Sequence, residues 1–173
     1  TTLTFEEYVT YDDGTDNRYE LEDGELILMN PSIGLHAIIL TYLSNTLLNE
    51  IQRLQLDWIP LQMLGVRTSV RRSRLPDLCV VSLAEMQAYL DVPAVLESGV
   101  ILAVEVVSTD SVTRDYRFKR AEYAAFGIPE YWIIDPQAET ILVLVLQDGR
   151  YEEATTLAGD DVVVSPQLDA LNV

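Results

Sequence analysis

A strand carboxylate and a helix lysine, both in apolar surroundings, constrain this chain more than any other feature. The stretch AVEVVSTDSVTRDYRFKRAEYAAFG, residues 103–127, predicts a buried strand, a polar turn and an amphipathic helix. Glu105 lies inside the apolar run of the strand, and Lys119, the only lysine of the chain, lies on the helix. Helical spacing predicts an inward stripe on this helix that consists of Val112, Tyr116, Lys119 and Tyr123.

A lysine on an inward stripe loses hydration, which is unfavourable unless a partner compensates for the loss. The nearest candidate partners of Lys119 are Glu105, on the preceding strand, and Asp115, one helical turn earlier. Alternatively, only the stem packs inward and the ammonium group reaches water at the surface.

A second stretch, RLPDLCVVS over residues 74–82, predicts another buried strand that begins at Pro76-Asp77. Asp77, Glu105 and Lys119 therefore lie on three successive core elements. Two carboxylates offer the hard oxygen ligands that Mg²⁺ or Mn²⁺ prefers. A nearby lysine can orient or deprotonate an attacking water and stabilise charge on a phosphate.

In this order and spacing, the residues resemble the PD-(D/E)XK nuclease superfamily. Most members carry the lysine two residues after the glutamate, where this chain has Val107, but some branches move it to the following helix, as at Lys119. The chain most closely resembles the Uma-type restriction-endonuclease-like family. The similarity covers most of residues 18–146 and includes RYELEDGELILM, RLPDLCVV, AVEVVSTDS, the Asp115 to Lys119 spacing and YAAFGIPEYWIID.

The resemblance implies a Mg²⁺- or Mn²⁺-dependent endonuclease that acts on DNA. Asp77 and Glu105 would hold the metal together with the Val106 carbonyl, and Lys119 would position the attacking water. Asp115 would orient Lys119. Glu20, in the N-terminal motif, would add a ligand or hold a water; alternatively it is an exposed strand carboxylate paired with Arg18 or another neighbour.

The predicted fold class is α/β, with one restriction-endonuclease-like domain over residues 1–173. Its core order is helix, three strands, helix and strand, with a mixed sheet and added N- and C-terminal hairpins. Asp23-Gly24 and Asp148-Gly149 predict the turns of these hairpins. We also expect a long helix over residues 33–56 with Ser32 as its N-cap, a strand over 58–70 with a bulge at Gly65, and a last strand within 161–173.

The apolar face expected for the long helix consists of Leu35, Ile38, Ile39, Tyr42, Leu43, Leu47, Ile51 and Leu54.

Net charge argues against simple binding to nucleic acid, because the chain carries 28 acidic and 11 basic residues, a balance of −17. Eight of the cations nevertheless flank the expected site, in the stretches 67–74 and 114–120. They either form a basic rim on an acidic body or are ordinary solvated charges. The candidates for nucleic-acid contact are Arg71, Arg72, Arg74, Arg114 and Arg117. Any such binding is expected to be weak and salt-dependent.

The alternative function is a catalytically silent binding or scaffold protein that keeps the nuclease fold, which accounts better for the charge. A homodimer is expected, with the apolar hairpin residues 141–146 as its surface. Cys79 is expected to be a buried hydrophobe and His36 either structural or close to the site; together they offer too few ligands for zinc. Residues 1–173 contain no recognisable signal peptide or membrane span, so a cytoplasmic location is expected.

Overall fold

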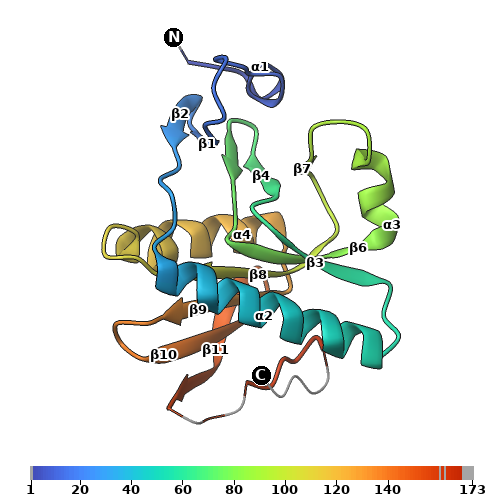
Figure 1. The fold of residues 1–173 in the computed structure, drawn as a ribbon, viewed down its shortest axis with the longest axis vertical. Coiled ribbons are helices and arrows are strands. Elements are labelled where there is room, and N and C mark those ends of the chain that lie inside the picture. Colours follow the sequence, from blue (N-terminus) through green and yellow to red (C-terminus); the bar gives the residue numbers. More distant parts are fainter. Residues whose placement is uncertain (1, 160, 162, 169–173) are drawn as a thin grey trace.

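The computed structural model describes residues 2–159, 161 and 163–168 and contains two mixed sheets (Figure 1). The larger sheet has the strand order β11-β10-β9-β8-β6-β3, in which only β8 and β9 are parallel neighbours. Its strands are β3 (Trp58–Gln62), β6 (Leu78–Ser82), β8 (Val100–Val106), β9 (Glu130–Asp135), β10 (Thr140–Gln147) and β11 (Arg150–Ala158).

The smaller sheet has the order β2-β1-β5-β4-β7, in which only β4 and β7 are parallel. Its strands are β1 (Tyr19–Glu22), β2 (Glu25–Leu28), β4 (Gly65–Ser69), β5 (Arg72–Arg74) and β7 (Val95–Leu96). The helices are α1 (Phe5–Val9), α2 (Gly34–Arg53), α3 (Leu83–Met86), a 3₁₀ turn Gln87–Tyr89, a π-helical segment Arg114–Lys119 and α4 (Arg120–Phe126).

The expected core elements follow one another along the chain as helix α2, strands β3, β6 and β8, helix α4 and strand β9, and these four strands all lie in the larger sheet. The α/β class with mixed sheets is therefore confirmed. The N-terminal hairpin, β1 and β2, does not extend this sheet but belongs to the smaller one, which the sequence did not predict as a separate sheet.

Strand β8 separates the two apolar cores of the molecule. Its residues Leu102, Val104 and Val106 pack on the side of α2, in a cluster that includes Leu43 and Leu47. Ala103 and Val107, with Tyr123 of α4, belong to the cluster on the opposite side. Since successive strand side chains alternate between faces, Glu105 points to the α4 side.

Both hairpin turns form as predicted. Asp23 and Gly24 have φ values of 51° and 89°, and Asp148 and Gly149 have 48° and 78°. Two successive residues at positive φ are typical of the type I′ turns that connect antiparallel strands.

The predicted single strand over residues 58–70 is wrong. The chain turns at Met63, which has φ 53°, and the two halves become β3 and β4 in different sheets. Gly65 begins β4 opposite Val95 of β7, where an added Cβ would lie 2.9 Å from Val95 Cγ2 and 3.1 Å from the carbonyl oxygen of Ala94. Gly65 is therefore required for the close approach of β7 rather than for a bulge.

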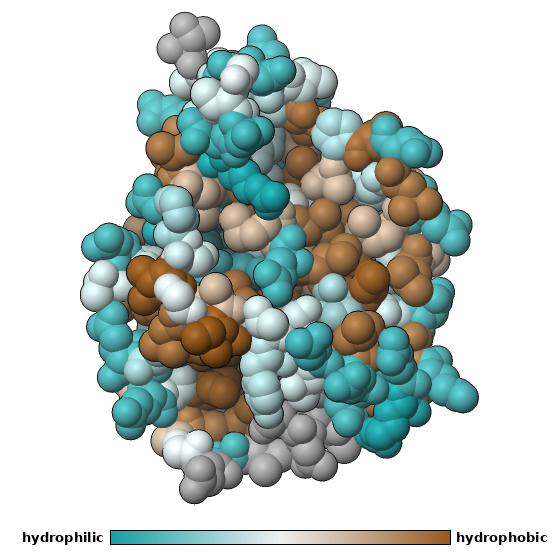
Figure 2. All heavy atoms as spheres, in the orientation of Figure 1, coloured by the Kyte–Doolittle hydropathy of each residue, from teal (hydrophilic) through white to brown (hydrophobic). Residues whose placement is uncertain are grey.

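The long helix is shorter than predicted and buries a narrower face. Helix α2 ends at Arg53, and Ile33 rather than Ser32 is its N-cap. The buried residues of α2 are Leu40, Leu43, Leu47 and Ile51. Leu35, Ile38 and Tyr42 were wrongly expected to be buried, because the sheet lies along only one stripe of the helix. The exposed apolar residues form a patch over the N-terminal half of α2 (Figure 2).

The C-terminal hairpin does not offer the apolar surface expected of it. Val143 packs in the core on the α2 side, and Leu142 and Leu144 pack in the core on the α4 side. Ile141, Val145 and Leu146 are half-buried, so only a small apolar surface remains for the dimer expected over residues 141–146. Of the strand expected within 161–173, residues 161 and 163–168 form no strand, and the rest lies outside the described residues.

Among the described residues, none of the helices combines the length and the apolar character needed to cross a bilayer.

We predict that Gly65→Ala lowers the free energy of unfolding by about 1–3 kcal/mol, because the new methyl group overlaps β7. Gly34→Ala is the matched control, since nothing lies within 4 Å of its Cβ position and alanine favours the helix. Urea unfolding measures both, and equal stability of the two variants would contradict the tight contact between β4 and β7.

Candidate active site

Lys119 lies inside the molecule among three carboxylates. Its Nζ is 2.8 Å from Glu105 Oε2, 3.3 Å from Asp115 Oδ1 and 3.8 Å from Glu20 Oε1. Only 4% of the lysine side chain is exposed, so its ammonium group does not reach water at the surface. The expected partners Glu105 and Asp115 are confirmed, and Glu20 joins them.

The local helix geometry brings Asp115 and Lys119 to the same inward side. The segment Arg114–Lys119 is π-helical and continues into α4; such wide turns occur frequently at functional sites. The Asp115 carboxylate also accepts a hydrogen bond from the Ser111 hydroxyl, and its backbone N–H donates to the Ser111 carbonyl. Val112 was wrongly assigned to the inward stripe, because it lies in the first turn of this helix and is 43% exposed.

Glu105 is held at both carboxylate oxygens by side chains of one helix. Lys119 contacts Oε2, and the Tyr123 hydroxyl donates to Oε1 over 2.6 Å. Burial raises the pKa of Glu105 well above its usual range; the charge of Lys119 opposes this rise, and the charge of Asp77 adds to it. Burial alone would lower the pKa of Lys119, but its carboxylate neighbours more than offset this effect and keep it an ammonium ion.

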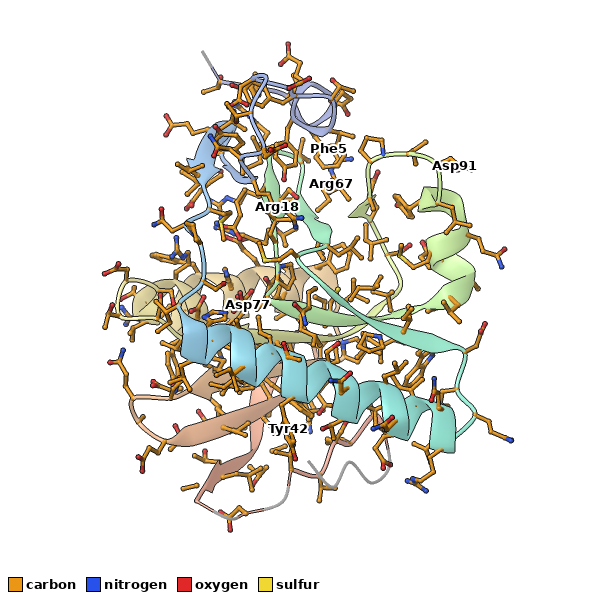
Figure 3. All side chains as sticks on the ribbon, viewed as in Figure 1. Phe5, Arg18, Tyr42, Arg67, Asp77 and Asp91 are labelled. Carbon is orange, nitrogen blue, oxygen red and sulfur yellow. The ribbon has the colours of Figure 1, made fainter. Side chains whose placement is uncertain are left out.

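Asp77 lies immediately before β6, as predicted, and close to the first turn of α2 (Figure 3). Its Oδ2 accepts a hydrogen bond of 2.7 Å from the backbone N–H of Val106. Its Oδ1 is 3.1 Å from His36 Nε2, so the single histidine does approach the site. The structure thus places Val106 beside Asp77 through its amide; metal binding by its carbonyl stays a prediction.

Glu20 is fully buried rather than exposed, so its predicted alternative pairing with Arg18 is wrong. One oxygen accepts from the backbone N–H of Leu75 and the other from Arg74 Nη1, each over 3.0 Å. Arg74 is itself buried and donates to both oxygens of Glu122, over 2.8 and 2.7 Å. This network fixes the carboxylate of Glu20 next to Lys119.

Arg74 therefore cannot contact phosphates, because no part of its side chain is exposed. Arg72 pairs with Asp23 and Glu122, so its guanidinium group is less available for contacts to phosphates. Arg114 is half-buried, whereas Arg71 and Arg117 are exposed. Of the five predicted nucleic-acid contact residues, only Arg71 and Arg117 are therefore exposed.

The donor set fits a hydrated magnesium ion better than a metal enclosed by protein ligands. In residues 2–159, 161 and 163–168, no group of three or more His, Cys, Asp or Glu side chains is arranged to hold a metal. Mg²⁺ commonly binds one or two carboxylates and keeps several waters. Asp77, directly before β6, accepts a hydrogen bond from the amide of Val106, which follows Glu105 on the adjacent strand β8. Burial raises the pKa of the Cys79 thiol to about 12, so it stays protonated at neutral pH.

Sequence reasoning missed the buried pair Arg74 and Glu122 and the role of Tyr123. Arg74 precedes Asp77 by three residues, and Glu122 follows Lys119 by three residues, so both lie close in sequence to predicted site residues. Helical spacing could have indicated that Glu122 and Lys119 lie on neighbouring faces, but only the fold shows that Arg74 joins Glu122 to Glu20.

Comparison with known proteins identifies the family of the chain and a structure with the same fold. The family model Uma2, described as "Putative restriction endonuclease", matches residues 5–172. The chain belongs to the Uma2 family. A crystal structure from Anabaena variabilis, described as "a putative nuclease belonging to DUF820", has a TM-score of 0.77 to this Uma2 chain. The two are 18% identical, over 96% of this chain and 91% of that one, so the likeness shows a shared fold. A search of curated proteins finds no match.

We predict that Lys119→Met lowers the free energy of unfolding by about 3–5 kcal/mol near neutral pH, because three carboxylates lose their shared cation. The loss should shrink as the pH falls, since Glu105 and Asp115, whose pKa values are raised by burial, take up protons in the folded state at a higher pH than in the unfolded chain.

Arg117→Met, the same charge change at an exposed position of the same helical segment, is the control and should change stability by under about 1 kcal/mol. Thermal or urea unfolding from pH 4.5 to 8 measures both variants. Equal stability of Lys119→Met and the parent at pH 7 would contradict the importance of this cluster.

Proposed function

We propose that this Uma2 protein hydrolyses phosphodiester bonds of nucleic acid, with DNA as its substrate and Mg²⁺ or Mn²⁺ as its cofactor. The observation that carries the proposal is the Lys119 ammonium group, held 2.8 Å from the strand carboxylate Glu105. Asp77 accepts a hydrogen bond from the amide of Val106, the residue that follows Glu105. A buried lysine between acidic groups at strand ends is an arrangement suited to phosphate chemistry.

Asp77 and Glu105 would hold the metal, and the Val106 carbonyl is the proposed third protein ligand. A bound divalent cation supplies charge to polarise a phosphate oxygen and lowers the pKa of a bound water. The backbone N–H of Val106 fixes Asp77 Oδ2, so Asp77 Oδ1, now near His36, is the oxygen available for a new partner.

Lys119 would act by hydrogen-bond donation and positive charge. Its surrounding carboxylates keep it protonated, so it is suited to orienting the attacking water and stabilising negative charge on the phosphate. Asp115, fixed by Ser111, orients the amine from one helical turn away. Glu20 faces the amine from the other sheet and would hold a water or complete the charge balance.

Nucleic-acid contacts are proposed for the exposed residues Arg71 and Arg117. Arg114 and Arg72, which are half-buried, would make smaller contributions. Because the whole chain carries a charge of −17, such binding should be weak and should fall steeply as salt rises.

A second candidate function is binding without catalysis. It is favoured because several arginines are already neutralised within the chain. Arg74 is buried, Arg67 pairs with Glu97, and Arg72 pairs with Asp23. A scaffold protein with the same fold would need no phosphate contacts.

We predict that Mn²⁺ or Mg²⁺ raises the melting temperature of the parent and supports cleavage of plasmid or single-stranded DNA. Asp77→Asn and Glu105→Gln should lose both responses while remaining folded. Lys119→Arg, which keeps the charge and shifts the donor, should keep the metal-induced rise but cleave about 10²–10⁴-fold more slowly.

Glu50→Gln, at a half-buried carboxylate near the end of α2 that pairs with Arg53, is the control and should behave like the parent. A parent protein that neither gains stability from metal nor cuts DNA would favour the binding function instead.

We further propose a homodimer, formed through α2 rather than through the C-terminal hairpin. Residues 26–49 contain no Asp, Glu, Lys or Arg, and the exposed apolar residues at the start of α2 lie within this stretch. Two copies with a charge of −17 repel each other, so a face without charges allows the closest approach. Twofold pairing of one such face with itself gives a closed assembly.

We predict that light scattering at micromolar concentration shows a dimer whose stability increases with salt, because salt screens the repulsion between the two copies. Ile38, which is 68% exposed, should be central, so Ile38→Glu should give monomers. Leu90→Glu, at a site 73% exposed on another surface, is the control. A monomeric parent would remove this proposal without affecting the proposed chemistry.

A further inference from the structure

Tyr123 makes a hydrogen bond that neither the proposed reaction nor the family comparison accounts for. Its hydroxyl donates to Glu105 Oε1 over 2.6 Å, and both side chains are buried, with 0% and 2% of their surface exposed. Tyr123 follows Lys119 by four residues, which is one helical turn. One face of one helix thus holds the two oxygens of Glu105 separately.

The tyrosine ring is itself fixed in place. It packs edge-on against Tyr131, with ring centroids 5.1 Å apart and an interplanar angle of 83°. The Tyr131 hydroxyl in turn donates to the backbone carbonyl of Asp115 over 3.0 Å. The Tyr123 hydroxyl therefore has little freedom to move. Through Tyr131, its ring is also connected to the helical segment that carries Lys119.

A carboxylate at the end of a glutamate side chain needs such a restraint if its orientation is to be fixed. The terminal torsion of glutamate is broad, so packing of the aliphatic part alone leaves the two oxygens poorly defined. A phenol is neutral at neutral pH and donates one hydrogen bond, so it orients one oxygen without competing as a cation.

We propose that Tyr123 is a positioning residue that fixes Glu105 as a metal ligand. It holds Oε1 from the side of α4 and leaves Oε2, the oxygen now on Lys119, as the one that a divalent cation can share. The proposal rests on the proposed function, because it assumes that Glu105 binds Mg²⁺ or Mn²⁺. Partners that orient a ligand in this way typically change metal affinity 10- to 100-fold when they are removed.

A purely structural role is the competing explanation. A buried carboxylate needs hydrogen bonds for its own stability, and the Tyr123 hydroxyl would then matter only for folding. The two roles differ in one measurable respect, since only the positioning role changes the affinity of the folded protein for metal.

Tyr123→Phe, which keeps the ring and removes only the hydroxyl, tests the proposal. Calorimetric titration with Mn²⁺ should show affinity 10- to 100-fold weaker than that of the parent. Tyr151→Phe is the matched control, because its hydroxyl is also buried and donates over 2.8 Å, but to the backbone carbonyl of Ile128. It should reduce stability comparably and bind Mn²⁺ as the parent does.

The outcomes separate this proposal from the proposed function. If the parent binds Mn²⁺, Asp77→Asn does not, and folded Tyr123→Phe binds as tightly as the parent, the positioning role is overturned and the metal site stands. If the parent itself binds no Mn²⁺, the metal site fails, and the positioning role fails with it.

A measurement on the parent covers the case in which Tyr123→Phe does not fold. In protein labelled with ¹³C at the tyrosine Cζ, addition of Mg²⁺ should shift the Tyr123 signal, because the accepting carboxylate then shares its charge with the cation. The Tyr151 signal should not move. An unmoved Tyr123 signal in Mg²⁺-saturated protein would overturn the proposal.

Discussion

The contact between one ammonium group and three buried carboxylates determines how the rest of this structure is arranged. Glu105 comes from the larger sheet, Glu20 from the smaller sheet, and Asp115 from the helical segment that carries Lys119. Charges of this kind are tolerated inside a protein only when each is paired and hydrogen-bonded. Two sheets and a helix must therefore be positioned together before any of these groups is satisfied.

Arg74 is a second buried cation that pairs with several carboxylates. Its guanidinium group joins Glu20 and Glu22 of β1 to Glu122 of α4, and Thr68 of β4 donates to Glu122 as well. The sequence around residue 74 resembles a basic surface, yet Arg74 is buried and connects strand β1 to helix α4 through ion pairs. The acidic composition of the chain is thus partly balanced inside the protein.

Much of this arrangement could be predicted from local patterns, because hairpin turns and the burial of short apolar strands depend mainly on neighbouring residues. The positions of Asp77 and Glu105 and the two Asp-Gly hairpins follow from such patterns. So do two of the three partners of Lys119, whereas Glu20 joins them only through the fold. The exposed face of α2, the division at Met63 and the second sheet could not be predicted, because they depend on which distant surface each apolar residue meets. The same limit applies to Tyr123 and Arg74, whose partners are 18 and 48 or more residues away.

The lysine at the centre of the site also affects whether folding precedes the binding of a divalent cation. Since Lys119 already compensates its acidic neighbours, the chain can reach its native state without taking up a divalent cation during synthesis. Many small metal-binding domains cannot do so, because metal binding and folding are there a single step. Here any cation would join a finished protein and could leave it again, so occupancy would follow the free metal concentration around the protein rather than its history of folding.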